Sequence, residues 1–305
     1  MDLRRYMKRT IEHGALWSGA PRAMRWRRRR DVLVLAYHNI VPHGEIVSGD
    51  ASLHLPQSHF AAQLDALSRT HDIVPLANAL DERQSRRPAV VITFDDAYRG
   101  AVTAGVAELA TRGMPATIFV ATAYVNDGDF WWDSLADPLL GAPSPELRRR
   151  ALDECAGEDA AVRDMAARDG LSRAVMPPPH ARGADERELA SAALARGVTL
   201  ASHTHSHPNL ARLVPDRLRA ELEQPLAWLR DRFVGVLPVL SYPYGISSAE
   251  VERAAEEAGY DAAFRIDGGW LPRPVRRHFA LPRLNVPSGL STAGLSLQCA
   301  GVRLR

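Results

Sequence analysis

The feature that most constrains this chain is a short apolar run that ends in two adjacent carboxylates. Residues 90–94 read VVITF and are followed directly by Asp95 and Asp96. A run of β-branched and aromatic residues of this length, preceded by Pro88, is typical of a strand buried on both faces. Two carboxylates at the end of such a strand can have separate roles, one binding a metal and the other accepting or donating a proton. The structural alternative is that Asp96 caps a helix beginning near Ala97.

A second cluster of chemically active side chains follows another apolar run. Residues 198–200 read VTL, and the polar stretch after them contains His203, His205 and His207. Imidazole is the commonest protein ligand for zinc-like ions, and two histidines with one carboxylate leave an open position for water. The alternative, a polar loop whose histidines face solvent, explains this motif only when the carboxylate pair is left aside. The two motifs together predict a hydrolytic metal site.

These motifs resemble those of a known enzyme family. Three stretches are similar to motifs of the polysaccharide deacetylases of carbohydrate esterase family 4, a group that includes chitooligosaccharide deacetylases: residues 93–96 (TFDD), 203–207 (HTHSH) and 241–245 (SYPYG). The resemblance covers about residues 32–290. It implies that Asp95 is the catalytic base. It also implies that Asp96, His203 and His207 hold one divalent metal, with Zn²⁺ as the first candidate, whereas His205 falls at a variable position.

The resemblance places the general acid at an unusual position. Most members take a histidine from a leucine-x-histidine motif late in the chain, where this sequence has Arg283 instead. A circularly permuted subgroup, which includes poly-N-acetylglucosamine deacetylases, takes it from a tyrosine-histidine pair on the first strand. Tyr37 and His38 match that arrangement, so His38 is implied as the acid. The alternative is a core histidine that is hydrogen-bonded for stability.

Other side chains are less suited to the role of acid. A guanidinium is too basic to donate a proton in catalysis, whereas an imidazole ordinarily titrates near neutral pH. Four further histidines are predicted to lie in loops or helices away from a strand end, namely His13, His43, His54 and His59.

Two further roles follow from the resemblance and from a departure from it. The family implies that the backbone N–H of Tyr244 binds the oxyanion. Ser241 stands where the family has an arginine that orients the base. Arg283, near the end of the last predicted strand, is the candidate replacement, and it is also a candidate substrate contact.

Residues 126–185 interrupt the alternation of strands and helices and predict an insertion that covers one end of the fold. It begins with the aromatic stretch 130–133 (FWWD) and continues as an Ala- and Arg-rich helical region. Trp131 and Trp132 are candidate substrate residues because an indole can stack on a sugar ring. They can equally anchor the insertion by burying a large apolar area.

Alternating strands and helices predict a parallel sheet with right-handed crossovers. We therefore expect an α/β fold, a distorted (β/α)7-type barrel with a helical insertion, in which active residues follow the C-terminal ends of strands. The expected strands are 31–38, 72–76, 90–94, 116–120, 198–200, 238–242, 262–266 and 281–286. The expected helices are 57–69, 101–112, 185–196, 216–233 and 248–258.

Composition fits one soluble domain of barrel size. The chain has 305 residues, of which 46% are hydrophobic and 24% charged. We expect a basic N-terminal segment at residues 1–30 and a deacetylase barrel at residues 31–305. The two cysteines, Cys155 and Cys299, lie far apart and predict free thiols in a reducing compartment.

The first thirty residues are strongly basic. They hold ten Arg or Lys against Asp2 and Glu12, so the remainder of the chain carries about −6 of the net +2. No apolar core suited to an export signal follows Arg4 and Arg5, and no stretch approaches the roughly 20 apolar residues of a membrane span. The sequence therefore predicts a cytoplasmic protein. Peripheral contact with an anionic membrane and a solvated basic arm both remain open, whereas nucleic acid binding is not expected.

The reaction expected from these residues is metal-dependent hydrolytic removal of an acyl group, first of all acetyl, from an amino sugar. The saccharide can be a polysaccharide, an oligosaccharide or a lipid-linked glycan. One rival is a metal-dependent amidohydrolase that acts on a non-carbohydrate amide. Such an enzyme would require further ligands and a second metal. The other rival is a non-catalytic saccharide-binding module. The presence of a base, metal ligands and a candidate acid argues against it.

Overall fold

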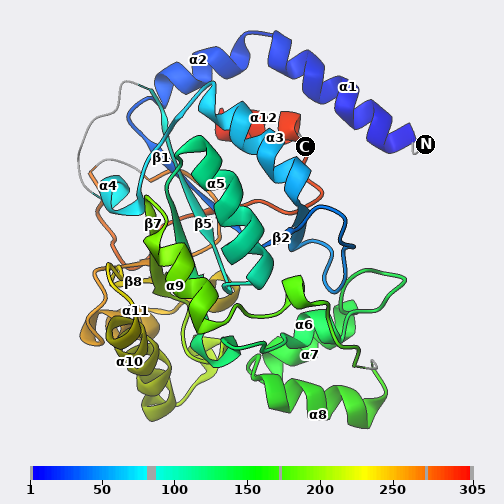
Figure 1. Cartoon of the computed structure of the whole chain (residues 1–305), viewed down its shortest axis with the longest axis vertical. Coiled ribbons are helices and arrows are strands. Elements are labelled where there is room, and N and C mark those ends of the chain that lie inside the picture. The colour runs from blue at the N-terminus through cyan, green and yellow to red at the C-terminus, as the bar shows by residue number, and fades with distance from the viewer. Residues whose placement is uncertain (1–2, 81–86, 172–173, 272–273, 303–305) are drawn as a thin grey trace.

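The computed structural model describes residues 3–80, 87–171, 174–271 and 274–302. Its central feature is a parallel sheet that curves into an incompletely closed barrel (Figure 1). The strands are β1 (Val32–Tyr37), β2 (Asn39–Val41), β3 (His54–Pro56), β4 (Asp72–Ile73), β5 (Ala89–Phe94), β6 (Ala116–Val120), β7 (Val198–Ser202), β8 (Val239–Ser241), β9 (Ala262–Phe264) and β10 (Leu284–Asn285).

The strand order explains why the barrel is distorted. It runs β10-β1-β5-β6-β7-β8-β9, with β4 also paired to β5, and β2 and β3 form a separate two-stranded ladder. Every pairing between these strands is parallel. Within the described ranges, no ladder joins β9 to β10, and the stretch before β10 meets β9 through an isolated parallel bridge between Leu281 and Phe264. The structure therefore confirms the predicted distorted (β/α)7-type barrel.

The helices surround the sheet. They are α1 (Leu3–Trp17), α2 (Ala20–Arg27), α3 (Gln57–Ser68), α4 (Leu76–Leu80), α5 (Val106–Arg112), α6 (Trp131–Ser134), α7 (Pro145–Asp153), α8 (Asp159–Asp169), α9 (Glu186–Leu194), α10 (Pro215–Arg232), α11 (Ala249–Glu257) and α12 (Thr292–Cys299). Shorter turns are the π-turn η1 (Ala101–Gly105) and the 3₁₀ turns η2 (Thr122–Tyr124), η3 (Pro179–Ala181), η4 (Leu210–Arg212) and η5 (Pro243–Gly245).

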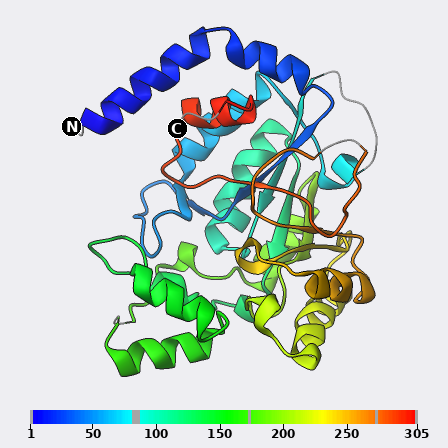
Figure 2. The same cartoon turned by 180° about the vertical axis from the view of Figure 1, so that it is seen from behind.

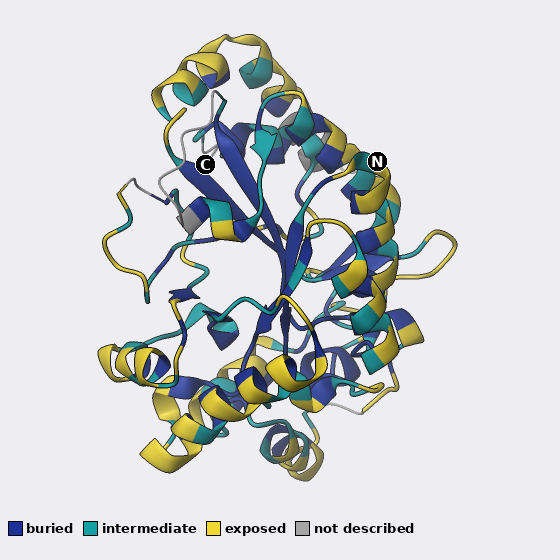
Figure 3. Ribbon diagram, turned by 60° about the vertical axis from the view of Figure 1, so that its left-hand side comes forward, coloured by how far each residue is buried: buried dark blue, intermediate teal, exposed yellow. Residues whose placement is uncertain are grey.

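Alternate side chains of β1 enter two different cores. Leu33 and Leu35 join the apolar cluster beneath the outer helices, whereas Val32 and Val34 fill the barrel interior. All six residues of β1 and all six of β5 are buried, as expected for strands covered on both faces. Figure 3 shows these buried strands beneath helices whose outer surfaces are exposed.

The insertion lies over the C-terminal ends of the strands. It contains α6, α7, α8 and η3 between β6 and β7. An antiparallel bridge joins Tyr98, after β5, to Gly183 at its far end. Figures 1 and 2 both show α6, α7 and α8 at the end of the molecule opposite to α1 and α2.

The N-terminal segment differs from a solvated arm because it forms two helices that pack on the barrel. Glu12 of α1 is buried and accepts a hydrogen bond from Ser291 Oγ at the start of α12, at 2.6 Å. Pro21 of α2 is also buried. Figure 2 shows α1 passing beside α12 and α3. In the described part of the chain, no helix combines the length and apolar character needed to cross a bilayer.

Three other local expectations needed correction. The expected helix 101–112 begins with the π-turn η1 before it becomes α5, although it ends at Gly113 as expected. The short ladder of β2 and β3 was not predicted, and it places His54 in a strand rather than in a loop or helix. The last helix, α12, was also not predicted, because its short apolar stretch lies among Gly and Ser residues with weak helical patterning.

Candidate active site

Parallel pairing brings the predicted acid and base to the same edge of the sheet. Tyr37 of β1 lies opposite Phe94 of β5, so the next residues, His38 and Asp95, are neighbours. The backbone N–H of Asp95 donates to the carbonyl of Tyr37 at 2.9 Å. His38 and Asp95 are far apart in the sequence, but they lie side by side because β1 and β5 end at the same edge of the sheet.

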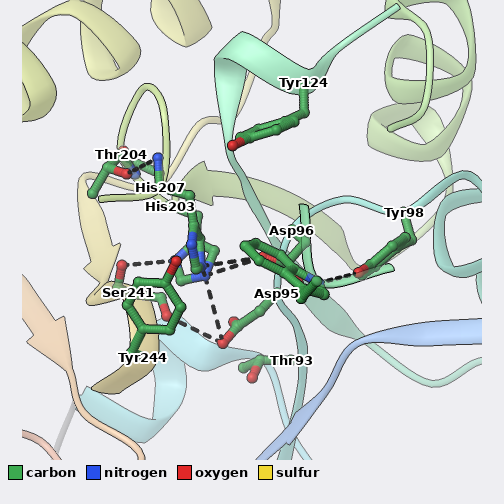
Figure 4. A network of polar contacts seen from close by, with 12 residues as sticks. Thr93, Asp95, Asp96, Tyr98, Tyr124, His203, Thr204, His207, Ser241 and Tyr244 are labelled. Carbon is green, nitrogen blue, oxygen red and sulfur yellow. Dashed lines mark hydrogen bonds and ion pairs between the residues drawn. The ribbon is translucent and has the colours of Figure 1, made fainter. Parts of the chain in front are cut away.

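The three predicted metal ligands converge at this edge (Figure 4). The Nε2 atoms of His203 and His207 lie 3.1 Å apart, and each lies 3.4 Å from Asp96 Oδ1. The Nδ1 atom of His203 faces the Ser241 carbonyl at 2.8 Å. That contact favours a proton on Nδ1 and leaves the Nε2 lone pair directed at the cluster, an arrangement typical of metal-binding histidines.

The donor set fits a divalent cation. All three side chains are buried, and their ligand atoms lie within 4.8 Å of one another. Asp96 Oδ1 is among the few buried side-chain atoms of the described residues that lack a hydrogen-bond partner. A buried, unpartnered carboxylate oxygen is costly unless something compensates it, and one carboxylate with two imidazoles is a common donor set for zinc.

Charges within the cluster shift the pKa values of its members. Burial by itself raises the pKa of Asp96, but the neighbouring imidazoles of His203 and His207 outweigh it and lower the pKa. Burial lowers the pKa of His203, yet the two aspartates raise it above its ordinary value. Burial and the neighbouring His203 lower the pKa of His207 to about 3. Any proton on His203 must leave before a metal binds, so metal affinity should fall in acid.

Asp95 has different surroundings from Asp96. Its two carboxylate oxygens accept hydrogen bonds from the two terminal nitrogens of Arg283, each at 2.7 Å. Burial raises the pKa of Asp95, but the Arg283 guanidinium, followed by His203, holds it well below its usual range. Asp95 is therefore ionised and fixed in orientation, as a carboxylate that accepts a proton must be.

Arg283 has no N–H group left for a substrate. Besides Asp95, it donates to Thr93 Oγ1 at 3.1 Å, to Ser241 Oγ at 2.7 Å and to the Arg265 carbonyl at 3.2 Å. These five bonds use all five guanidinium donors, and the side chain is fully buried. The expectation that Arg283 contacts substrate is therefore wrong. The guanidinium instead occupies the place of an orienting group for Asp95.

His38 lies at the cavity with its imidazole uncommitted. It follows β1 directly, is partly exposed, and lies close enough to influence the pKa values of Asp95 and Asp96. Across the residues that the structure describes, its side chain makes no hydrogen bond or ion pair. The alternative of a hydrogen-bonded core histidine therefore has no support in its contacts.

One cavity of about 320 Å³ contains the predicted site. Its lining includes the six residues expected to bind metal or act in catalysis, namely His38, Asp95, Asp96, His203, His207 and Tyr244. His205 is not among them, because its Nδ1 atom contacts Thr122 Oγ1 at 2.9 Å instead. A buried carboxylate pair, two imidazoles and a third, free imidazole can support hydrolysis by base and acid.

Comparison with known proteins agrees with this geometry. The family model described as polysaccharide deacetylase matches residues 82–263, more than half of the chain. This chain belongs to the polysaccharide deacetylases. The family and the fold identify an amide hydrolase of the carbohydrate esterase family 4 type, for which an N-acetylated saccharide is the substrate class.

Individual relatives of this deacetylase are distant in sequence. YxkH of Bacillus subtilis (strain 168), a protein named for the same family, is 23% identical over 266 residues, which cover 85% of this chain and 72% of YxkH. The Streptococcus pyogenes deacetylase PplD, solved in complex with acetate, has a TM-score of 0.62 at 16% identity and covers 88% of this chain and 98% of its own.

Two further solved structures share the fold. IcaB from Ammonifex degensii has a TM-score of 0.58 at 17% identity, over 89% of this chain and 97% of IcaB. The deacetylase domain of BpsB from Bordetella bronchiseptica has a TM-score of 0.57 at 15% identity, over 84% and 96% of the two chains. At identities of 15–17%, these similarities show that the chains share a fold.

The site of this deacetylase stores backbone strain. Positive φ angles occur at Asp96 (70°), Thr204 (69°), His207 (57°) and Tyr244 (58°). Such angles are uncommon in residues other than glycine, and they persist where the surrounding structure determines them. For Asp96 the angle belongs to a turn, the helical residues after it begin at Arg99, and no backbone N–H in the described segments donates to its carboxylate. The capping alternative for Asp96 is therefore excluded.

Tyr244 presents a backbone donor at the cavity. It lies in η5, where the N–H groups of Gly245 and Ile246 bond to preceding carbonyls. No hydrogen bond from the N–H of Tyr244 occurs within the described segments. Its ring packs against His207 with centroids 4.7 Å apart. The free N–H and the ring place Tyr244 beside the metal ligands.

Trp131 and Trp132 do not offer a sugar-stacking surface. Although both line the cavity, only 1% and 4% of their surfaces are exposed. Trp132 stacks on Phe130 and packs against His207, each with centroids 4.8 Å apart. The expected substrate role is therefore wrong for both rings, because they are covered by protein. They pack the insertion against the site.

A buried polar chain next to Trp132 escaped the sequence analysis. Trp132 Nε1 donates to Tyr98 Oη at 2.8 Å, and Tyr98 Oη donates to Asp133 Oδ2 at 2.6 Å. Asp133 Oδ1 lies 2.8 Å from His54 Nε2. An acidic residue in an aromatic stretch was the available signal, but His54 could not be paired with it without knowledge of the fold.

Proposed function

We propose that this deacetylase uses one divalent metal, Zn²⁺ in the first instance, to hydrolyse the N-acetyl group of an amino-sugar-containing saccharide. The observation that carries the proposal is the convergence of Asp96 Oδ1 with two imidazole nitrogens beside a separately held Asp95. Asp96, His203 and His207 would hold the metal. When bound there, such a metal lowers the pKa of a water molecule and polarises an acyl carbonyl.

Each remaining role goes to a residue of the cavity. Asp95, fixed by Arg283, accepts the proton of the attacking water. The N–H of Tyr244 donates to the oxyanion that forms on the acetyl carbon. His38 then donates a proton to the departing amine, because an amine leaves a tetrahedral intermediate slowly without one. Acetate and a free amino sugar are the products.

The two alternative functions, a two-metal amidohydrolase and a saccharide-binding module, would require different sites. An amidohydrolase with two metals would need a second group of ligands, and the described residues contain one such group. A non-catalytic saccharide-binding module would not need a buried carboxylate held by two guanidinium hydrogen bonds beside a cluster of imidazoles. The proposal therefore rests on one metal and on hydrolysis.

Acetate release tests the proposed function directly. Purified full-length protein, loaded with Zn²⁺, should release acetate from at least one member of a panel of N-acetylated mono-, oligo- and polysaccharides. A chelator should abolish release, and Zn²⁺ should restore it with a stoichiometry of one. Release only from non-carbohydrate amides, or a stoichiometry of two, would favour the amidohydrolase. Saccharide binding without acetate release at any metal would favour the binding module.

We expect Arg283→Met to weaken both fold and catalysis. It leaves Asp95 as an unpaired buried carboxylate, which costs about 3–5 kcal/mol of stability. Because Arg283 lowers the pKa of Asp95, its loss should raise that pKa. The acid limb of the kcat/KM profile should therefore move to higher pH.

A second variant keeps this prediction testable if Arg283→Met folds poorly. Ser241→Arg combined with Arg283→Ser restores an arginine at the position where the family has it, and Ser241 Oγ already lies 3.3 Å from Asp95 Oδ2. The double variant should recover turnover and the original acid limb relative to Arg283→Ser alone. If the acid limb lies at the same pH in the wild-type protein, in Arg283→Ser and in the double variant, Arg283 does not set the protonation of Asp95.

A further inference from the structure

The two N-terminal helices expose large apolar side chains at the end of the barrel remote from the cavity. Trp17 is 89% exposed, Trp26 67% and Ile11 55%. Scattered single apolar residues are normal on a protein surface, but two exposed tryptophans on consecutive helices mark a contact surface. We define the N-terminal face as the exposed residues Ile11, Trp17, Arg22, Trp26, Arg27, Arg29 and Arg30.

The N-terminal face is also strongly cationic. Its four arginines are exposed, and none forms an ion pair with any residue in the described ranges. The nearby carboxylates are engaged elsewhere, since Asp31 pairs with Arg28 at 3.4 Å and Glu12 is buried against Ser291. The guanidinium of Arg29 lies over the Trp26 ring at 4.6 Å. Positive charge and an exposed indole therefore meet directly at Trp26.

We propose that the N-terminal face binds the anionic phospholipid surface of a membrane. Indole rings prefer the boundary between headgroups and acyl chains, and arginines beside them are attracted to anionic headgroups. The face would lie in the plane of the bilayer, with Trp17 and Trp26 at the depth of the headgroups. Peripheral attachment of this kind needs no membrane-spanning helix.

The fold fixes how an attached enzyme would be oriented. The helix α2 leads directly into β1, so the N-terminal face lies at the N-terminal ends of the strands. The site lies at the opposite end, where His38 and Asp95 follow β1 and β5 (Figures 1 and 2). Attachment therefore holds the site away from the bilayer. Resting on the proposed function, this geometry favours a saccharide that extends into the aqueous phase over the membrane-proximal sugar of a lipid-linked glycan.

Vesicle co-sedimentation tests the attachment. Full-length protein should bind vesicles of phosphatidylcholine with phosphatidylserine and should be released by salt, because screening weakens the attraction. Changing Arg22, Arg27, Arg29 and Arg30 to Gln should weaken binding on the order of 100-fold or more. A matched control changes four exposed arginines near the other end of the molecule, Arg149, Arg212, Arg217 and Arg219, to Gln, and it should bind like the unaltered protein.

Three outcomes would overturn the proposal. Equal binding by the face variant and the control variant would mean that net charge alone is responsible. Equal binding to pure phosphatidylcholine vesicles would mean that headgroup charge is not recognised. Displacement of the protein from vesicles by RNA at lower concentration than by soluble phosphatidylserine would assign the face to nucleic acid.

Tryptophan quenching tests the orientation separately. Brominated phospholipid chains should quench the fluorescence of bound wild-type protein. Trp270 lies beside Arg28 at the same end of the molecule, with the guanidinium 5.1 Å from its ring, so the test variant combines Trp17→Phe and Trp26→Phe with Trp270→Phe and should lose that quenching. If the remaining tryptophans of this bound variant are still quenched, the orientation is wrong. Turnover of a soluble N-acetylated saccharide should be unchanged in the face variants. A wild-type protein that binds vesicles but releases no acetate would contradict the proposed function and leave the attachment intact.

Discussion

His203→Ala and His207→Ala should each lose metal and turnover together, whereas Asp95→Asn should keep the metal and lose about 10²- to 10⁴-fold in turnover. The reason is the division between the two aspartates. Asp96 Oδ1 faces both imidazoles without a partner, while both oxygens of Asp95 are held by Arg283. Metal content by elemental analysis and acetate release from the same preparations measure both effects.

His205→Ala is the matched control for this series. His205 belongs to the same motif, but its ring contacts Thr122 rather than the cluster. It should retain metal and most turnover. A metal-free Asp95→Asn protein together with a metal-loaded Asp96→Asn protein would reverse the assignment of base and ligand.

His38→Ala should keep the fold and the metal and lose most turnover of N-acetyl substrates. Three histidines line the cavity, and His203 and His207 are placed as ligands, so His38 is the remaining imidazole able to donate a proton. A general acid is worth about 10²- to 10⁴-fold. Activated acetate esters should suffer much less than amides, because a good leaving group departs without protonation. Parallel kcat/KM measurements on an amide and an activated ester give the comparison.

His43→Ala controls for the loss of an imidazole from the same region. His43 is exposed and outside the cavity lining, so its removal should leave both substrates unaffected. If His38→Ala loses amide and ester hydrolysis in the same proportion, or arrives without metal, His38 is not the acid. The resemblance to the permuted subgroup would then not extend to the origin of the proton.

The catalytic edge could be predicted from the sequence because its residues follow apolar strands directly. The runs before His38, Asp95 and His203 are mainly apolar, and parallel strands place their C-terminal ends at one edge. Local pattern therefore predicted the fold class and the carboxylates and histidines that gather there. The roles of His38 and Tyr244, and the candidate replacement of the orienting arginine by Arg283, came from the resemblance to the family.

Only the tertiary structure decided what those residues contact. The bonds between Arg283 and Asp95 join positions 188 residues apart, and no periodicity reports such a pairing. The sequence did not distinguish two roles for Trp131 and Trp132, because a tryptophan in an insertion can contact either substrate or protein. Both side chains are buried against the protein. The N-terminal arginines suggested a free arm, yet Glu12 holds α1 against α12 through Ser291. Long-range contacts of this kind depend on the packing of whole elements, which the chain specifies only once it is folded.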